Sequence, residues 1–285
     1  FGTRPATYYI TTTQADSAEK NATKWWLERT LKPIDNEKLP IVVATGVTWK
    51  LFAKRAEKAK ARRFWDFSNG TVTIIELPTS GHEGTARKFG YMFMEAFRNA
   101  SRQDRVDDLG SKSLYTNLQT NKYEEPDTCF MPRRLLNPQN PTRYPCDHEG
   151  TPWPTIIVEV AFSETLEHVR EKINNYWLAP NRAEDVIVIK LGSWKEKRHD
   201  RNGNPLRRLL CQKFCRRATL QQNPNATTFE PVQEIEFGSI YRNGRPAVIS
   251  SLPFPPQTPV PLSVPGVAID LYDIQELIFF YMGPN

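Results

Sequence analysis

The sequence predicts an α/β fold with a mixed central sheet flanked by helices. Two runs rich in Ile and Val, at residues 155–162 and 185–191, are apolar enough for central strands that are buried on both faces. Residues 164–178, between these runs, show helical spacing and follow Ser163, a natural N-cap. Upstream, an Asn69-Gly70 turn between two β-type runs predicts a hairpin.

The remaining elements follow from local patterns along the chain. We expect a helix at residues 83–97, a short strand at 127–131, and a strand followed by a helix at 267–280. Residues 100–124 are polar and residues 223–265 are rich in proline, so both segments are expected to be irregular.

At the domain level, residues 1–45 are expected to be an N-terminal helical extension and residues 46–285 to form the main domain. Two segments are strongly basic, and each is either a solvated surface or a surface that contacts phosphate. The first is a helix at residues 47–63 that carries Lys54, Arg55, Lys58, Lys60, Arg62 and Arg63. The second is a long hairpin that turns at Gly203 and carries Lys195, Lys197, Arg198 and Arg201.

Composition limits the classes of function. The 285 residues carry a net charge of +6 with a pI near 9.1, which fits an anionic partner such as nucleic acid and also fits solubility alone. No run of about 18 apolar residues occurs, so no membrane-spanning helix is expected. The four cysteines are expected to be reduced, and an intracellular location is favoured over secretion. The alternative is a zinc site made of Cys146, His148, Cys211 and Cys215.

One residue violates its local pattern. Glu159 stands inside a strand made otherwise of apolar residues, and an ionised carboxylate there is unfavourable unless it is paired or holds a metal. Strand alternation puts Glu159 on one face with Ile157 and Ala161. A second carboxylate, Asp127, begins the earlier strand directly after a proline. If the two strands are neighbours, the carboxylates converge, and such a pair suits Mg²⁺ or Mn²⁺.

A cation is available on the helix that follows Glu159. Lys172 lies at the flank of the apolar stripe, one turn from Val169 and from Tyr176. Hydrolysis of a phosphodiester needs a metal that polarises the phosphate and a cation that stabilises the developing charge. Asp127, Glu159 and Lys172 therefore predict a metal-dependent nuclease site.

These residues match a family pattern. The stretches Glu125-Pro126-Asp127, residues 157–163 and residues 171–176 resemble the restriction endonuclease-like family of the PD-(D/E)XK nuclease superfamily. The run at residues 78–83, which includes His82, looks like the start of the first core helix of that family, and residues 266–271 look like its last strand. The resemblance covers about residues 64–280.

The resemblance implies a PD-(D/E)XK fold, with Asp127 and Glu159 as ligands of Mg²⁺ or Mn²⁺ and the Val160 carbonyl beside them. It also implies Lys172 as the active-site lysine, because the usual position two residues after the carboxylate is Ala161 here. Glu83, expected on the inward face of its helix, would support the metal site. The implied activity is endonucleolytic hydrolysis, with DNA favoured over RNA as the partner and a homodimer left open.

Each residue also has a structural interpretation. Glu159 could pair with a core cation, Asp127 could only form a turn, and Lys172 could be an exposed helix lysine. Glu83 could merely favour the helix N-terminus. The alternative functions are a catalytically inactive nucleic-acid-binding protein and a protein-interaction module on the same fold.

Overall fold

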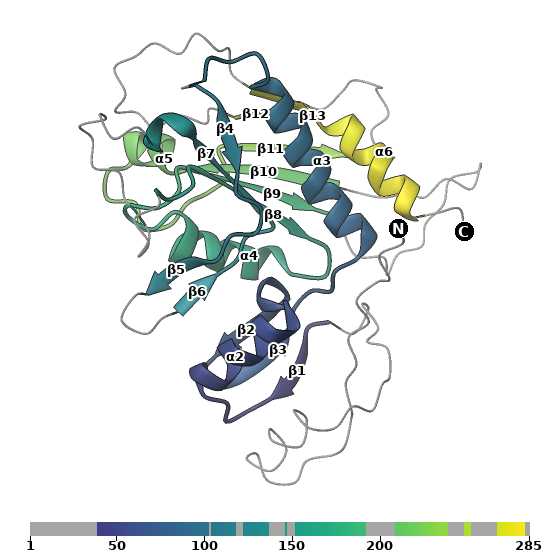
Figure 1. Ribbon diagram of the computed structural model, residues 1–285, viewed down its shortest axis with the longest axis vertical. Helices are drawn as coiled ribbons and strands as arrows, with labels where there is room; N and C mark the ends of the chain where they lie inside the picture. Colours follow the sequence, from purple (N-terminus) through teal and green to yellow (C-terminus); the bar gives the residue numbers. More distant parts are fainter. Residues whose placement is uncertain are drawn as a thin grey trace. The chain divides into compact units, whose positions relative to one another are not determined.

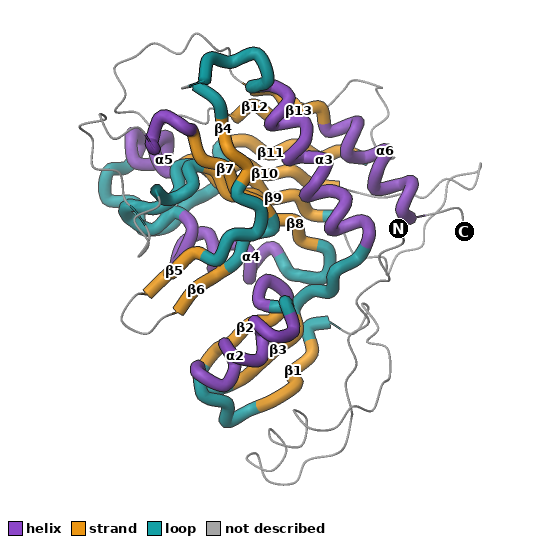
Figure 2. The backbone as a smooth tube through the Cα atoms, in the orientation of Figure 1, coloured by secondary structure: helices purple, strands orange, loops and turns teal. Residues whose placement is uncertain are grey.

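The structure, a computed structural model, describes residues 39–102, 104–117, 122–136, 146, 152–191, 209–238, 248–251 and 267–282 (Figures 1 and 2). The chain divides into two compact units. Of the described residues, unit 1 contains 39–80 together with Phe162–Glu164, and unit 2 contains the others. Most of the expected N-terminal helical extension and the tip of the basic hairpin lie outside the described residues, so the expected boundary at residue 45 stays a prediction.

Unit 1 contains a three-stranded antiparallel sheet in the order β1-β3-β2. The strands are β1 (Ile41–Ala44), β2 (Trp65–Ser68) and β3 (Thr71–Ile74), and the helices are α2 (Trp49–Ala59) and the short 3₁₀ turn η2 (Arg62–Phe64). The expected hairpin is confirmed as β2–β3. Its turn residues Asn69 and Gly70 have φ values of 48° and 78°, the left-handed pair that a two-residue turn requires.

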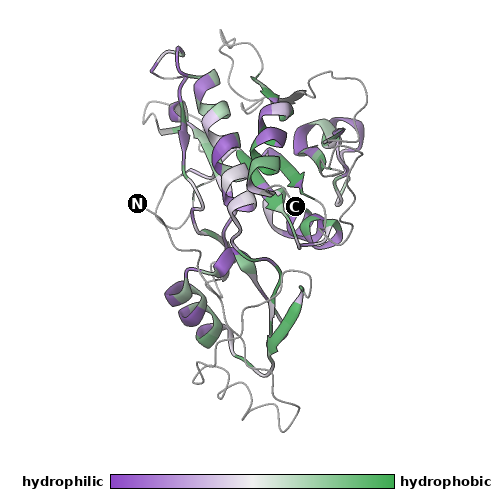
Figure 3. Ribbon diagram, turned by 90° about the vertical axis from the view of Figure 1, so that its right-hand side faces the viewer, coloured by the Kyte–Doolittle hydropathy of each residue, from purple (hydrophilic) through white to green (hydrophobic). Residues whose placement is uncertain are grey.

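Helix α2 separates an apolar from a basic side. Phe52 and Ala56 are buried in the core of unit 1. The exposed lysines Lys50, Lys54 and Lys58 are spaced four residues apart, so they form one row along the outer face. The helix is coloured largely as hydrophilic in Figure 3.

Arg62 was expected on this basic surface, and that expectation is wrong. Its side chain is buried and donates from Nη1 to the carbonyl of Trp65 at 3.0 Å. Its guanidinium lies 5.3 Å from the ring centroid of Trp49 and 5.0 Å from that of Phe52. A planar cation can be buried in this way because aromatic faces and a carbonyl replace water.

Glu76 caps a loop in unit 1. Its Oε2 accepts hydrogen bonds from the backbone amides of Phe162, Ser163 and Glu164 at 2.7, 2.8 and 3.1 Å. These amides are therefore occupied, and the helix that follows begins later than expected. Its N-cap is Thr165, whose side chain accepts from the amide of His168, and not Ser163.

Unit 2 is organised around a six-stranded sheet in the order β11-β10-β9-β8-β7-β4. The strands are β4 (Val106–Asp108), β7 (Thr128–Pro132), β8 (Ile156–Ala161), β9 (Asp185–Lys190), β10 (Leu209–Cys215) and β11 (Gln233–Phe237). Strands β8 and β9 are parallel, and the other neighbours are antiparallel. The mixed sheet predicted from the two apolar runs is confirmed.

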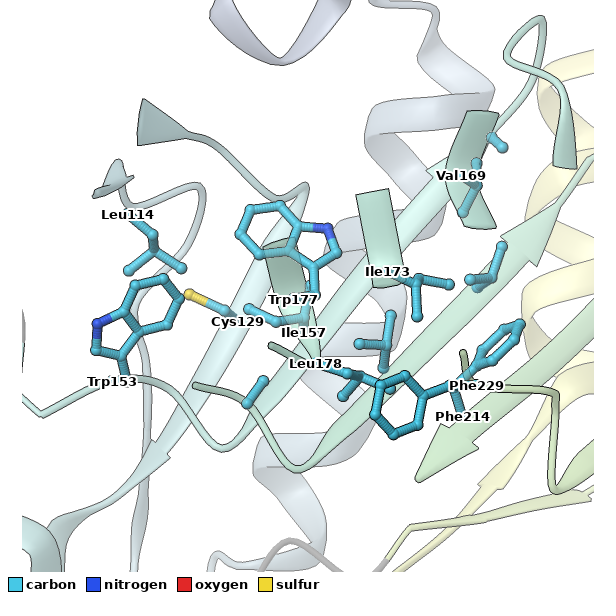
Figure 4. Close-up of a cluster of buried hydrophobic side chains, with 14 residues drawn as sticks. Leu114, Cys129, Trp153, Ile157, Val169, Ile173, Trp177, Leu178, Phe214 and Phe229 are labelled. Atoms are coloured by element: carbon cyan, nitrogen blue, oxygen red, sulfur yellow. The ribbon is translucent and has the colours of Figure 1, made fainter. Parts of the chain in front are cut away.

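Helices cover both faces of this sheet. On one face, α4 (Leu166–Lys172) and the π turn η4 (Ile173–Trp177) pack Val169, Ile173 and Trp177 against the strands (Figure 4). On the other face, α3 (Ser80–Ala96) packs Phe93 against Phe130 of β7, with ring centroids 4.5 Å apart. The expected layer order of helix, sheet and helix is therefore present in unit 2.

Smaller elements complete unit 2. These are the η3 turn (Arg133–Leu136), the pair β5 (Leu114–Asn117) and β6 (Lys122–Glu124), α5 (Arg216–Gln222), the pair β12 (Val248–Ser251) and β13 (Val267–Asp270), and α6 (Leu271–Met282). Helix α6 lies beside α3, where Lys88 and Asp273 form an ion pair of 3.0 Å (Figure 1). Across the parts of the chain that the structure describes, no helix has the length and hydrophobicity needed to span a membrane.

Two segments expected to be irregular contain strands. Residues 100–124 include β4, β5 and β6, and residues 223–265 include β11 and β12. These strands are short or lie at a sheet edge, and β11 carries Glu234 and Glu236, so none has the apolar run of a central strand.

Candidate functional site

Asp127 directly precedes β7 and Glu159 lies on β8, and these two strands are neighbours. Strand β7 begins at Thr128, which pairs with Val158 of β8, and the next position of the same antiparallel register sets Asp127 opposite Glu159. At this end the Asp127 side chain takes the place of a backbone acceptor of β7, because its Oδ2 accepts a hydrogen bond from the Val160 amide at 2.7 Å. Asp127 is only 8% exposed, so its position is fixed by the protein and not by solvent.

The carbonyl of Val160 also lies near the start of β7. In a β-strand, the N–H and the C=O of one residue point toward the same neighbouring strand. The Val160 amide meets Asp127, so its carbonyl also points to that side, and β7 pairs with β8 only from Thr128 onward. The Asp127 carboxylate and the Val160 carbonyl therefore lie at the same end of β7.

Glu159 is held by two donors from the helical segment above its face of the sheet. Its Oε2 accepts from Lys172 Nζ at 2.8 Å, and its Oε1 accepts from Trp177 Nε1 at 2.6 Å. The residue is 2% exposed. The predicted alternation is confirmed, because Ile157 and Ala161 lie in the same core cluster as Trp177 (Figure 4). Lys172 is 8% exposed, so the interpretation as a solvated helix lysine is wrong.

His82 is a site residue to which the sequence analysis gave no role. Its Nε2 lies 3.4 Å from Asp127 Oδ2, and its Nδ1 lies 3.3 Å from Glu83 Oε1. The His82 side chain is buried, whereas that of Glu83 is 29% exposed. The helix therefore turns His82 inward, and Glu83, expected on the inward face, is partly exposed, so its supporting role stays a prediction. The sequence does indicate that His82 is buried, because His82, Phe89 and Phe93 are spaced so that they share one helical face.

The donor set fits a hard divalent cation. Glu83, His82 and Asp127 form one set of contacts, and Glu159 and Lys172 form another. Within the described parts of the chain, no three His, Cys, Asp or Glu side chains form a group that could hold a metal. Mg²⁺ does not need such a group, because it is commonly bound through one or two carboxylates together with water and substrate phosphate. Asp127, Glu159 and the Val160 carbonyl are the groups here that could supply such oxygen ligands.

The cysteines do not support the zinc alternative. Cys211 is buried in a strand, and burial raises the pKa of its thiol. Burial and the nearby Asp185 raise the pKa of Cys215 to about 11, and its sulfur accepts from the amide of Ala218. Metal ligation requires a thiolate, which these environments disfavour. Of the other two members of the expected set, Cys146 is exposed and His148 lies outside the described residues.

Comparison with known proteins finds no protein-family model that matches the chain and no curated protein with significant similarity to it.

Proposed function

We propose that this chain is a metal-dependent nuclease of the restriction endonuclease-like PD-(D/E)XK kind, which hydrolyses phosphodiesters, with DNA favoured as substrate. One observation carries the proposal: a buried lysine, Lys172, binds a buried strand carboxylate, Glu159, which stands opposite a second carboxylate, Asp127. The two carboxylates come from facing positions of neighbouring strands, and a phosphodiesterase that uses a metal needs carboxylate ligands of this kind.

The roles follow from the contacts. Asp127, Glu159 and the Val160 carbonyl would hold Mg²⁺ or Mn²⁺, which when bound polarises the phosphate and makes water a better nucleophile. The Lys172 ammonium would stabilise the negative charge that develops on the phosphate oxygens. His82 would keep the Asp127 carboxylate in place through its 3.4 Å contact, with Glu83 on the other ring nitrogen.

The charge of the chain agrees with an anionic polymer as substrate. The net charge is +6, and the row of Lys50, Lys54 and Lys58 on α2 is exposed. Evenly spaced lysines can contact the phosphates of a nucleic-acid backbone, and such contacts depend on charge and not on base sequence.

A second candidate is a nucleic-acid-binding protein on the same fold without catalysis. It is favoured by the fact that both oxygens of Glu159 already accept hydrogen bonds, from Lys172 and Trp177. A carboxylate that is paired in this way can be purely structural. However, two charged oxygens offer about four acceptor positions, so these two donors leave room for a metal.

The test uses the purified chain with plasmid, linear and single-stranded DNA and with RNA, each with Mg²⁺, Mn²⁺ or EDTA. The proposal expects cleavage that requires the metal and is lost in Glu159→Gln. The matched control is Glu167→Gln, which changes an exposed carboxyl on α4 and should leave cleavage intact. Binding without cleavage of any substrate supports the second candidate, and cleavage that persists in Glu159→Gln contradicts the assigned site.

A further inference from the structure

We propose that the π turn η4 makes Trp177 a positioning residue for Glu159, so that the metal affinity of the site depends on the indole N–H. This inference rests on the proposed function, because it concerns the carboxylate assigned there to the metal. Trp177 is outside the motif on which the family resemblance was based, and its indole touches neither Asp127 nor the Val160 carbonyl in any contact described above.

The π turn changes which side chains share a face. An α-helix rotates by about 100° per residue, so two residues five positions apart point in directions that differ by about 140°. Lys172 and Trp177 are five positions apart, yet both reach the carboxylate of Glu159. The segment pairs residues five apart, as the bond from the Leu178 amide to the Ile173 carbonyl at 2.9 Å shows. In a π turn, residues five apart are linked by the backbone hydrogen bond and lie closer to one face than they do in an α-helix.

The two donors do different things to Glu159. Lys172 binds Oε2 and brings a positive charge, whereas Trp177 binds Oε1 without any charge. The indole therefore fixes the plane of the carboxylate without adding a second positive charge to it. Trp177 has no exposed surface, and Ile173 and Leu178 beside it are equally buried, so the ring cannot turn away from this bond.

A hydrogen bond to a metal ligand has a measurable consequence. Groups that orient a ligand from behind commonly contribute about 10- to 100-fold to metal affinity or activity. Phenylalanine retains most of the apolar ring of tryptophan and lacks the N–H donor. We therefore expect Trp177→Phe to bind Mn²⁺ about 10-fold more weakly than the wild-type chain, as measured by calorimetry.

The matched control is Trp153→Phe. Trp153 is buried in the same hydrophobic cluster, where it lies beside Leu114 and Cys129 (Figure 4). Its replacement removes the same atoms from the same core, so Mn²⁺ affinity should stay at the wild-type value. Equal losses in both variants, or no loss in Trp177→Phe, would overturn the proposal.

A second measurement needs no metal and no substitution of Trp177. In protein labelled with ¹⁵N-tryptophan, the assigned Trp177 indole proton should resonate far downfield, because it donates to a charged oxygen. Glu159→Gln should move this signal upfield and leave the Trp153 signal in place. An unchanged Trp177 signal overturns the hydrogen bond and leaves the nuclease proposal intact. A wild-type chain that binds no Mn²⁺ while the Trp177 signal moves overturns the metal site, and with it the positioning role.

Discussion

The Nζ atom of Lys172 lies 2.8 Å from Oε2 of Glu159, and both side chains are almost fully buried. A pair of this kind has two separate properties. It stabilises the fold only as long as both partners are present, because a single buried charge is strongly unfavourable. In the proposed nuclease it also brings a positive charge to the carboxylate that holds the metal. Substitution of Lys172 should therefore affect both stability and catalysis, and the two effects can be measured separately.

Lys172→Ala should lower the cleavage rate by about 10²-fold or more at saturating metal, since it removes a contact to the transition state. Without metal, the unpaired Glu159 should lower the free energy of unfolding by on the order of 3 kcal/mol. Lys172→Arg should not fully restore the rate, because a planar guanidinium does not replace a compact ammonium. Lys190→Ala, on the neighbouring strand β9, is the control and should cleave normally. A wild-type rate in Lys172→Ala would contradict the assigned role.

Asp127→Asn should abolish Mn²⁺ binding in calorimetry while the fold is retained. The amide oxygen of asparagine can still accept from the Val160 amide, so the end of β7 keeps its hydrogen bond. Glu159→Gln should have the same effect on the metal, because each change removes charge that the cation requires. Undiminished Mn²⁺ affinity in Asp127→Asn would show that the metal binds elsewhere.

Replacement of Lys50, Lys54 and Lys58 by glutamine should weaken nucleic-acid binding and flatten its dependence on salt. Each lost phosphate contact should reduce the slope of log affinity against log salt by about 0.9 for duplex DNA. Glu57→Gln, on the same exposed helix, removes a negative charge and should act in the opposite direction. An unchanged slope in the triple variant would exclude α2 from the binding surface. Neutralising Lys195, Lys197, Arg198 and Arg201 tests the hairpin tip, which lies outside the described residues, in the same assay.

Glu184→Gln should stabilise the protein at neutral pH. Burial raises the pKa of Glu184 above its usual range, although Arg216 acts against this. The folded state therefore holds the proton more tightly than the unfolded chain, and stability falls as the pH rises through the usual glutamate pKa toward the raised value. Urea unfolding should show a gain for the variant near pH 7 that disappears near pH 3.5. Glu230→Gln, at an exposed carboxyl, should show no such difference. A gain that is equal at both pH values would exclude this cause.

Glu76→Ala should be among the most destabilising substitutions in unit 1. It removes the acceptor of the three amide groups of Phe162, Ser163 and Glu164, and it leaves these amides without that partner. Hydrogen bonds to a charged acceptor are the stronger kind, so we expect a loss on the order of 3 kcal/mol in the free energy of unfolding. Glu76→Gln keeps one acceptor oxygen and should lose less. Glu57→Ala is the exposed control. Equal stability of Glu76→Ala and Glu57→Ala would contradict the capping role.

The elements that the sequence predicted are those with a strong local pattern. The central strands β8 and β9, the β2–β3 hairpin and the inward direction of Glu159 all follow from alternation, apolar runs or turn residues. Strand β11 was missed because an edge strand needs only one apolar side, and its sequence alternates with glutamate.

Two further differences come from contacts that are distant in sequence or from a change of helical phase. The amide of Ser163 is occupied by Glu76, 87 residues earlier, so local capping rules chose the wrong N-cap. Lys172 and Trp177 share a target because of the π turn, whereas a pattern based on 3.6 residues per turn places these two residues on different faces. Sequence periodicity therefore identified Lys172 as a candidate site residue, but it did not predict that Lys172 and Trp177 bind the same carboxylate.

The parallel pair β8–β9 also sets the order in which the candidate site can assemble. Parallel neighbours must be joined by a crossover, and here the crossover is the segment that contains Lys172 and Trp177. During synthesis Glu159 leaves the ribosome before either of its donors, and it gains them only when the crossover docks. The acid, its lysine and its indole thus come together in one folding event, so a nascent chain that ends before this segment has no assembled site.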